Sequence, residues 1–420
     1  MRAHAIACAL ILTFAACSDD SGDSHGSLLD AATQDGGPAD APSDDSSPAD
    51  ASSDANEAGA STTRRVLAAP GEGSVYPGWY SHDVHGEFEP YNSLMGGSPK
   101  VIFTFHDWNG AGTASGQVSL RTFDTPLEGS DDQTVLDAAR MAAEAGSILA
   151  LAWDAVGYVG FEESYWKGEL ELAISFQDIL DGKYDAYIRT CAEQVRDLDV
   201  PVMLSPFAEI DSITWFMFGP DELTPLETVD DPRVHYGDPT LPDGPERLRD
   251  AYRHVVDIFR EEQVANVTWF MYAGSAYMGI GDKSPEEIAR LDEVHPRFFY
   301  PGDDYVDWIG TSLYVESGVE TLGDKLDTGM TAWRQVTQRP FFAPELGVVA
   351  SGGQDRTAAI AGLVDALPSS GVQIVGFADT ELYALIFDVP RLDDNPSEAQ
   401  AWRAVMSDPR YAQELVFETR

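Results

Sequence analysis

Beyond residue 65 the chain alternates short apolar runs with amphipathic stretches. Five of the amphipathic stretches have helical spacing of their apolar residues, at 134–145, 184–198, 245–262, 325–337 and 356–367. Eight apolar runs have the length and residue types of strands: 73–80, 101–108, 148–154, 200–209, 266–273, 306–314, 340–348 and 374–379. Strands that are apolar on both faces belong in a parallel sheet covered by helices, so the pattern predicts an α/β fold, a closed (β/α)8 TIM barrel.

The structural alternative to a barrel is an open, doubly wound sheet. That fold usually has a glycine-rich turn after its first strand. The sequence has no such turn after residues 73–80, which favours the barrel.

Several of the apolar runs end in a polar or aromatic residue. Burying a carboxylate at the end of an apolar strand is costly unless the group has a purpose. In a barrel the carboxyl ends of all strands share one mouth, where active sites are built. We therefore expect one site from Asp107, Trp108, Trp153, Asp154, Glu209, Tyr314, Glu345 and Asp379.

Two of these residues have the types and positions of a glycosidase pair. Glu209 ends the fourth run and Glu345 ends the seventh, so the two carboxylates would face each other across the mouth. A retaining glycosidase needs such groups about 5–5.5 Å apart, one as nucleophile and one as acid and then base. Taken singly, each Glu is better explained by a salt bridge at the rim; the two together favour the catalytic pair.

The first 65 residues indicate export and tethering. A basic start and an apolar run at 5–15, too short to cross a bilayer, end in Phe14-Ala15-Ala16-Cys17. This segment resembles a bacterial lipoprotein signal, which implies lipidation of Cys17 and, with Ser18 next, the outer membrane; ordinary secretion is the alternative. Residues 18–65 are rich in Asp, Ser, Ala, Gly and Pro, which predicts a disordered linker. Residues 66–420 then form one catalytic domain.

Composition narrows the range of partners. The chain has 71 acidic and 26 basic residues and a formal charge of −45. Such a chain repels nucleic acid and anionic polysaccharide, so a neutral polysaccharide or oligosaccharide is the better substrate. After processing, Cys191 is the one cysteine left, so we expect no intrachain disulfide. The histidines lack metal-ligand spacing, so no metal or other cofactor is expected; we expect a monomer.

Four segments, in the same order as in a known family, resemble glycoside hydrolase family 26, which contains endo-β-mannanases with some xylanases and β-glucanases. They are ILALAWD at 148–154, DILDGKYDAYI at 178–188, FYPGDDYVDWIG at 299–310 and PFFAPELG at 340–347. The likeness covers most of residues 75–390. It implies a retaining endo-β-glycanase in which Glu345 is the nucleophile and Glu209 the acid/base.

Several residues are candidates for binding substrate, the first of them from the family resemblance. Tyr314 corresponds to a Tyr that hydrogen-bonds the nucleophile. Trp153, Trp215 and Trp269 are candidates for stacking on the apolar face of a sugar, with core packing as the alternative. His106 is a candidate for bonding a sugar hydroxyl, and a hydrogen-bonded core histidine is an equal alternative.

The segment around Glu209 departs from the family pattern R-x-x-H-E-M-N-G. Ser205 stands in place of the Arg, Ala208 in place of the His and Asp211 in place of the Asn. An inward-facing Asp211 would favour the protonated form of Glu209. Either another group replaces the Arg and a β-glycanase, foremost a β-1,4-mannanase, survives, or the barrel binds glycans at the cell surface without cleaving them.

Overall fold

Eight parallel strand positions close into a barrel in the computed structural model, which confirms the predicted fold. The structure describes residues 63–109, 118–127, 132–155, 174–210, 236–238, 241, 243–274, 295–316, 322–349, 356–378 and 394–420. In barrel order the strands are β2 (Tyr76–Tyr80), β3 (Val101–Asp107), β4 (Ile148–Asp154), β5 (Val202–Ser205), β6 (Val267–Ala273), β7 (Trp308–Thr311) with β8 (Leu313–Glu316), β9 (Phe341–Val349) and β10 (Val372–Ala378). Strand β10 pairs with both β9 and β2, which closes the sheet.

Two of the predicted strands differ in detail from the observed ones. The run 306–314 is interrupted at Ser312, so that β7 pairs with β6 and β9 while β8 pairs with β9 alone. The run 200–209 is a strand only as far as Ser205. Both interruptions lie at the carboxyl ends of the strands, where polar side chains leave the regular ladder.

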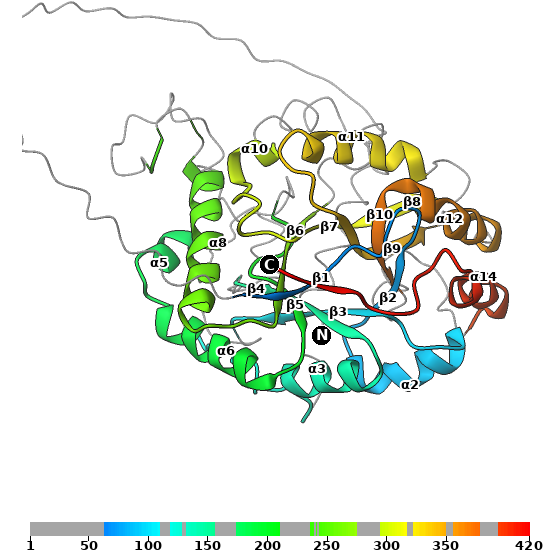
Figure 1. Cartoon of the computed structure of the whole chain (residues 1–420), viewed down its shortest axis with the longest axis horizontal. Helices are drawn as coiled ribbons and strands as arrows, with labels where there is room; N and C mark the ends of the chain where they lie inside the picture. Colours follow the sequence, from blue (N-terminus) through cyan, green and yellow to red (C-terminus); the bar gives the residue numbers. More distant parts are fainter. Residues whose placement is uncertain are drawn as a thin grey trace, which may run out of the picture.

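Helices surround the strands in Figure 1. They are α2 (Val84–Met95), α3 (Val135–Glu144), α5 (Phe176–Leu180), α6 (Asp185–Leu198), α8 (Asp243–Glu261), α10 (Pro296–Phe299), α11 (Leu322–Arg334), α12 (Thr357–Ser370) and α14 (Pro396–Ser407). The five predicted helices correspond to α3, α6, α8, α11 and α12; the other four were not expected. Across the described ranges, we find no helix with the length and apolar character needed to cross a bilayer.

Along each strand, side chains point alternately into a core inside the barrel and into a core between the barrel and the helices. Phe103, Phe270 and Phe342 pack inside the barrel with ring centroids 5.5–6.3 Å apart. Their neighbours Ile102, Trp269 and Phe341 pack outward against the helices. Because side chains alternate faces along a strand, this register decides which strand residues can reach the mouth.

The amino end of the barrel is closed by the two ends of the domain. Strand β1 (Arg65–Leu67) pairs antiparallel with β11 (Phe417–Thr419), and the two cross the end of the barrel in Figure 1. The Leu67 amide donates to Thr268 Oγ1 at 2.8 Å, and the Trp308 indole donates to the Leu67 carbonyl at 2.9 Å. The small sheet is therefore bonded to the first residues of β6 and β7.

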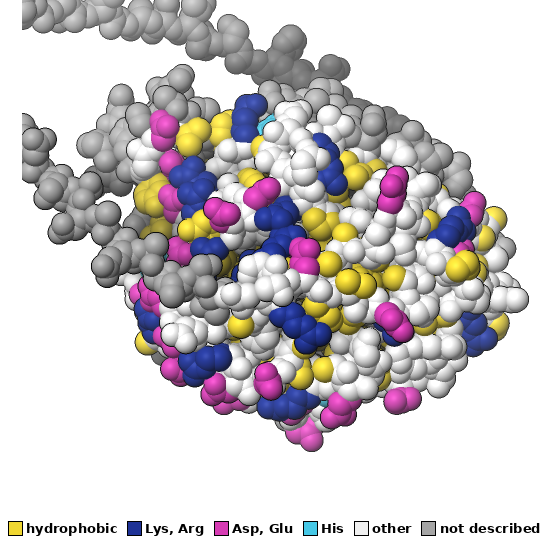
Figure 2. All heavy atoms as spheres, in the orientation of Figure 1, with side chains coloured by type: hydrophobic (Ala, Val, Ile, Leu, Met, Phe, Trp, Pro, Cys, Tyr) yellow, Lys and Arg dark blue, Asp and Glu magenta, His cyan; other side chains and the backbone are white. Residues whose placement is uncertain are grey.

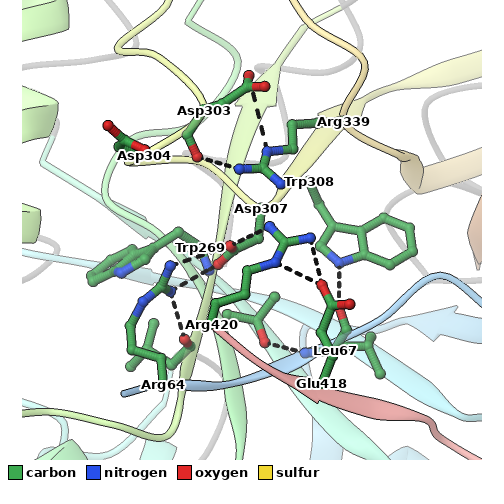
Figure 3. A network of polar contacts seen from close by, with 12 residues as sticks. Arg64, Leu67, Trp269, Asp303, Asp304, Asp307, Trp308, Arg339, Glu418 and Arg420 are labelled. Carbon is green, nitrogen blue, oxygen red and sulfur yellow. Dashed lines mark hydrogen bonds and ion pairs between the residues drawn. The ribbon is translucent and has the colours of Figure 1, made fainter. Parts of the chain in front are cut away.

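A buried carboxylate holds this closure in place. Asp307, just before β7, accepts from Arg64 and from Arg420, each at 2.9 Å, and from the Trp269 amide at 2.8 Å (Figure 3). Figure 2 shows basic and acidic side chains intermixed over this face. Asp303 and Asp304 lie on the same side (Figure 3), away from the mouth. The closure leaves the carboxyl end of the strands, the barrel mouth, as the place for an active site.

Candidate active site

Glu209 is positioned by an irregular turn after β5. Its backbone has φ = 46°, a left-handed conformation that is uncommon for a residue with a side chain and that often marks a functional site. Ser205 Oγ stabilises the turn by donating to the Phe207 carbonyl at 2.6 Å and accepting from the Tyr272 amide at 3.1 Å. The Ile210 amide donates to the Tyr272 carbonyl at 3.2 Å. The turn is thus fastened to the end of β6.

Glu345 is positioned by an irregularity in β9. Ala343 pairs with Val375 and Leu346 pairs with Phe377, so β9 has one more residue than β10 over this interval. Phe342 faces the interior, and both Ala343 and Leu346 face the helices. An extra residue re-aims the side chains beside it, which lets the Glu345 carboxylate turn into the barrel mouth.

Both oxygens of the Glu345 carboxylate accept hydrogen bonds from tyrosines. Tyr272 Oη, from β6, donates to Oε1 at 2.6 Å, and Tyr314 Oη, from β8, donates to Oε2 at 2.5 Å. The contact from Tyr314 is the one that the family resemblance implied. Two donors stabilise the ionised form of a carboxylate in a site from which water is largely excluded; Glu345 has no exposed surface.

Ser312 connects this carboxylate to Glu209. Its Oγ lies within hydrogen-bond distance of both groups, 3.1 Å from Glu209 Oε1 and 2.7 Å from Tyr272 Oη. The two carboxylates are therefore closer than the sum of three hydrogen-bond lengths, and bends at the hydroxyl oxygens shorten the distance further. This upper bound lies below the roughly 9.5 Å at which two carboxylates can still flank a glycosidic bond.

Two more carboxylates end neighbouring strands at the mouth. Asp107 of β3 pairs in register with Asp154 of β4, and each is 5% exposed. Phe105 and Ala152, two residues earlier, belong to the interior cluster, so these carboxylates share the interior face. The structure thus places four of the carboxylates that the sequence predicted at strand ends at the carboxyl end of the barrel.

Trp153 and Trp269 are not sugar-stacking residues, and that prediction is wrong for both. Trp153 is fully buried among Trp108, Phe123 and Phe259, and its indole donates to Tyr187 Oη at 3.1 Å. Trp269 packs edge-on against Phe259. Both face the helix layer, since the residues beside them in the strand face the interior.

His106 also faces away from the mouth, which corrects its assignment to substrate. It pairs in register with the outward-facing Trp153, its ring packs on Phe123, and Nε2 lies 3.3 Å from the Arg121 carbonyl. Because Phe105 faces the interior, His106 must face the helices. It is a core histidine, which was the other reading of the sequence.

Some candidates lie outside the part of the chain that the structure describes: Cys17, Asp211, Trp215 and Asp379. Conversely, sequence reasoning missed Tyr272 and Ser312. Tyr272 shares one strand face with Thr268 and Phe270, but the sequence does not say that this face is the interior. Ser312 carried no signal at all. Among the described residues, no three His, Cys, Asp or Glu side chains are grouped as a metal site.

Comparison with known proteins supports the fold. The structure is similar to a double mutant of Cellulomonas fimi endo-β-1,4-mannanase, with a TM-score of 0.53 and 16% identity, over 81% of this chain and 72% of that one. It is also similar to GH26A from a Muricauda species, with a TM-score of 0.48 and 17% identity, over 81% and 91% of the two chains. At 16% identity, the likeness to the Cellulomonas fimi enzyme shows a shared (β/α)8 fold.

One curated protein matches by sequence. Endoglucanase H of Acetivibrio thermocellus is 25% identical over 180 residues, which are 43% of this chain. The chain spans only 15% of the length of that relative. No family model matches the chain.

Proposed function

We propose that this protein is a retaining endo-β-glycanase of neutral hemicellulose, with β-1,4-mannan as the first candidate substrate. The observation that carries the proposal is the convergence of Glu209 and Glu345 at one barrel mouth, joined through Ser312 and Tyr272. The mannanase and the endoglucanase to which the chain is similar support the substrate class.

In the proposed first step, Glu345 attacks the anomeric carbon while Glu209 gives its proton to the leaving glycosidic oxygen. The C–O bond to the leaving sugar breaks as the bond to Glu345 forms. In the second step, water attacks the same carbon, Glu209 takes a proton from that water, and the bond to Glu345 breaks. Tyr314 and Tyr272 hold Glu345 ionised and oriented before the first step.

Acidity around the mouth supports a neutral substrate. Asp107 and Asp154 add two carboxylates to the two that would act on the bond. A uronic acid polymer would be repelled by these groups, whereas the hydroxyls of a neutral sugar can donate to them.

An assay for reducing ends released from mannan, xylan and mixed-linked glucan tests the proposal. Glu345→Ala and Glu209→Gln are each expected to lower kcat by about a thousandfold or more, and Glu193→Gln on the exposed face of α6 is the matched control. Azide should then restore turnover of an activated β-glycoside, giving an α-glycosyl azide with the Glu345 variant. Full activity in either variant would remove that residue from its assigned role.

A second candidate is a barrel that binds glycans without cleaving them. It is favoured by the complete burial of Glu345, with both its oxygens bonded to tyrosines. Ser205 and Ala208, in place of an Arg and a His, point the same way. Retardation in a glycan affinity gel, without release of reducing ends, would support this function over hydrolysis.

Attachment to the bacterial envelope through Cys17 is part of the same proposal. Its support is the sequence Phe14-Ala15-Ala16-Cys17 and the acidic, Pro- and Ser-rich composition of 18–65. Cys17→Ser is expected to move the protein from the membrane fraction, with the outer membrane first, to the soluble fraction of a bacterial host. Unchanged fractionation would contradict lipid anchoring.

A further inference from the structure

Four oxygen-bearing side chains form one unbroken line at the barrel mouth. Glu345 Oε1, Tyr272 Oη, Ser312 Oγ and Glu209 Oε1 follow each other at 2.6, 2.7 and 3.1 Å. They come from β9, β6, the break between β7 and β8, and the turn after β5. Tyr272 has no exposed surface and Ser312 is 1% exposed. The line is therefore closed to water along its middle.

The line has fewer hydroxyl hydrogens than it has contacts to fill. It contains three oxygen–oxygen contacts, but the two hydroxyl groups supply two hydrogens. With both carboxylates ionised, one contact would bring two oxygens together without a hydrogen between them. With one carboxyl protonated, all three contacts are hydrogen bonds that run in the same direction. The geometry thus suits one proton shared by two carboxyl groups.

The direction of the line follows from Tyr314. Its hydroxyl donates to Glu345 Oε2, and Tyr272 donates to Oε1, so Glu345 receives two hydrogens and is best satisfied as an anion. The proton then belongs on Glu209, which donates to Ser312, which donates to Tyr272, which donates to Glu345.

We propose that Ser312 and Tyr272 are positioning residues through which Glu209 and Glu345 share a single proton, held on Glu209 before the reaction. This inference rests on the proposed function and deepens it, since a proton on Glu209 and a charge on Glu345 are the state from which double displacement begins. When Glu209 has given up its proton and Glu345 has become an ester, the two hydroxyls reverse. Tyr272 then donates to Ser312 and Ser312 donates to the Glu209 carboxylate, which readies it to accept a proton from water.

A test that needs no substrate is the infrared band of a protonated carboxyl group. The difference spectrum between the wild type and Glu209→Gln is expected to contain this band at neutral pH. Ser312→Ala and Tyr272→Phe are each expected to lower, by about one pH unit, the pH at which the band disappears, because one hydrogen bond to the line is lost. Ser312→Thr keeps the hydroxyl and should restore the wild-type titration. This protein-only measurement keeps a failure of the proton line distinguishable from a failure of the hydrolase proposal.

The pH dependence of kcat/KM gives a second readout. The line stabilises the singly protonated pair, which is the active state. Breaking the line should therefore bring the acidic and basic limits of the bell-shaped kcat/KM profile closer together by about one pH unit in total. A merely structural role would lower kcat and leave the width of the profile unchanged. Thr311→Val removes the neighbouring hydroxyl, which bonds the Gly274 carbonyl at 2.7 Å, and should leave the width unchanged. Titratable groups at the same mouth are Asp107 of β3, Asp154 of β4, Tyr314 of β8, and Tyr80 and His82 at the end of β2, and these remain in every variant.

The proposal is overturned by any of three results. The first is that the wild type lacks the protonated-carboxyl band at neutral pH. The second is that the band remains in Glu209→Gln and disappears in Glu345→Gln. The third is that neither Ser312→Ala nor Tyr272→Phe changes the pH at which the band disappears.

Discussion

Gly376 of β10 lies directly against the carbonyl oxygen of Pro344 in β9. A Cβ built at position 376 would be 2.1 Å from that oxygen, far inside any permitted contact. Pro344 precedes Glu345 and belongs to the irregularity that turns Glu345 into the mouth. Because Gly376 has no side chain, β10 can approach Pro344 closely, and this approach positions the Glu345 carboxylate on β9.

Gly376→Ala is expected to displace Pro344 and Glu345 together. Activity should fall about tenfold or more, since small misplacements of a reacting group are costly, and stability should fall as well. Gly362→Ala is the matched control, because a Cβ on this helical glycine of α12 meets no atom within 4 Å. That variant should be fully active and up to about 1 kcal/mol more stable. Wild-type kinetics for Gly376→Ala would show that the contact does not position Glu345.

Asp307→Asn should strongly destabilise the domain. The change removes the carboxylate between Arg64 and Arg420 (Figure 3) and leaves the largely buried Arg64 without its counter-charge, at a cost of about 3–5 kcal/mol. Urea unfolding measures this cost. The exposed neighbour Asp304 provides the control: Asp304→Asn should change the free energy of unfolding by less than about 0.5 kcal/mol. Equal effects of the two variants would contradict the role given to the closure.

Thr134→Ala removes half of the capping box at the start of α3. Thr134 Oγ1 accepts from the Asp137 amide at 3.1 Å and donates to the Asp137 carboxylate at 2.7 Å. The loss of the cap should cost about 1 kcal/mol at pH 7.

This cost should depend on pH in one direction. The hydrogen bond from Thr134 is the largest influence that lowers the pKa of Asp137 from 3.8. A lowered folded-state pKa gives stability that is present above the unfolded value and is lost as pH falls through the folded one. The difference in unfolding free energy between wild type and Thr134→Ala should therefore be constant at neutral pH and shrink below pH 3.8. A difference that grows on acidification would refute the assignment.

Trp153→Phe distinguishes core packing from sugar binding. The smaller ring leaves space beside Trp108 and removes the donor to Tyr187 Oη, at a cost of about 2 kcal/mol in stability. KM for the polysaccharide should not change, because the indole faces the helix layer. A large rise in KM with unchanged stability would return Trp153 to the substrate.

The sequence by itself determined the barrel and its catalytic candidates. Eight apolar runs separated by helical stretches have few arrangements that cover both faces of every strand, so local patterning was enough to predict closure. A carboxylate at the end of such a run is conspicuous for the same reason, and Glu209 and Glu345 were found in this way. The sequence did not show the contacts that link these two carboxylates.

Tertiary structure decided which face each side chain occupies and which hydroxyls lie between the two carboxylates. An aromatic residue in a fully buried strand looks the same to sequence reasoning on either face, so Trp153, Trp269 and Tyr272 were not separable by residue type. The break at Ser312 and the extra residue before Leu346 shift the register locally. Contacts between residues 209, 272, 312 and 345 depend on that register, because a shift of one residue in a strand turns its side chains to the other face.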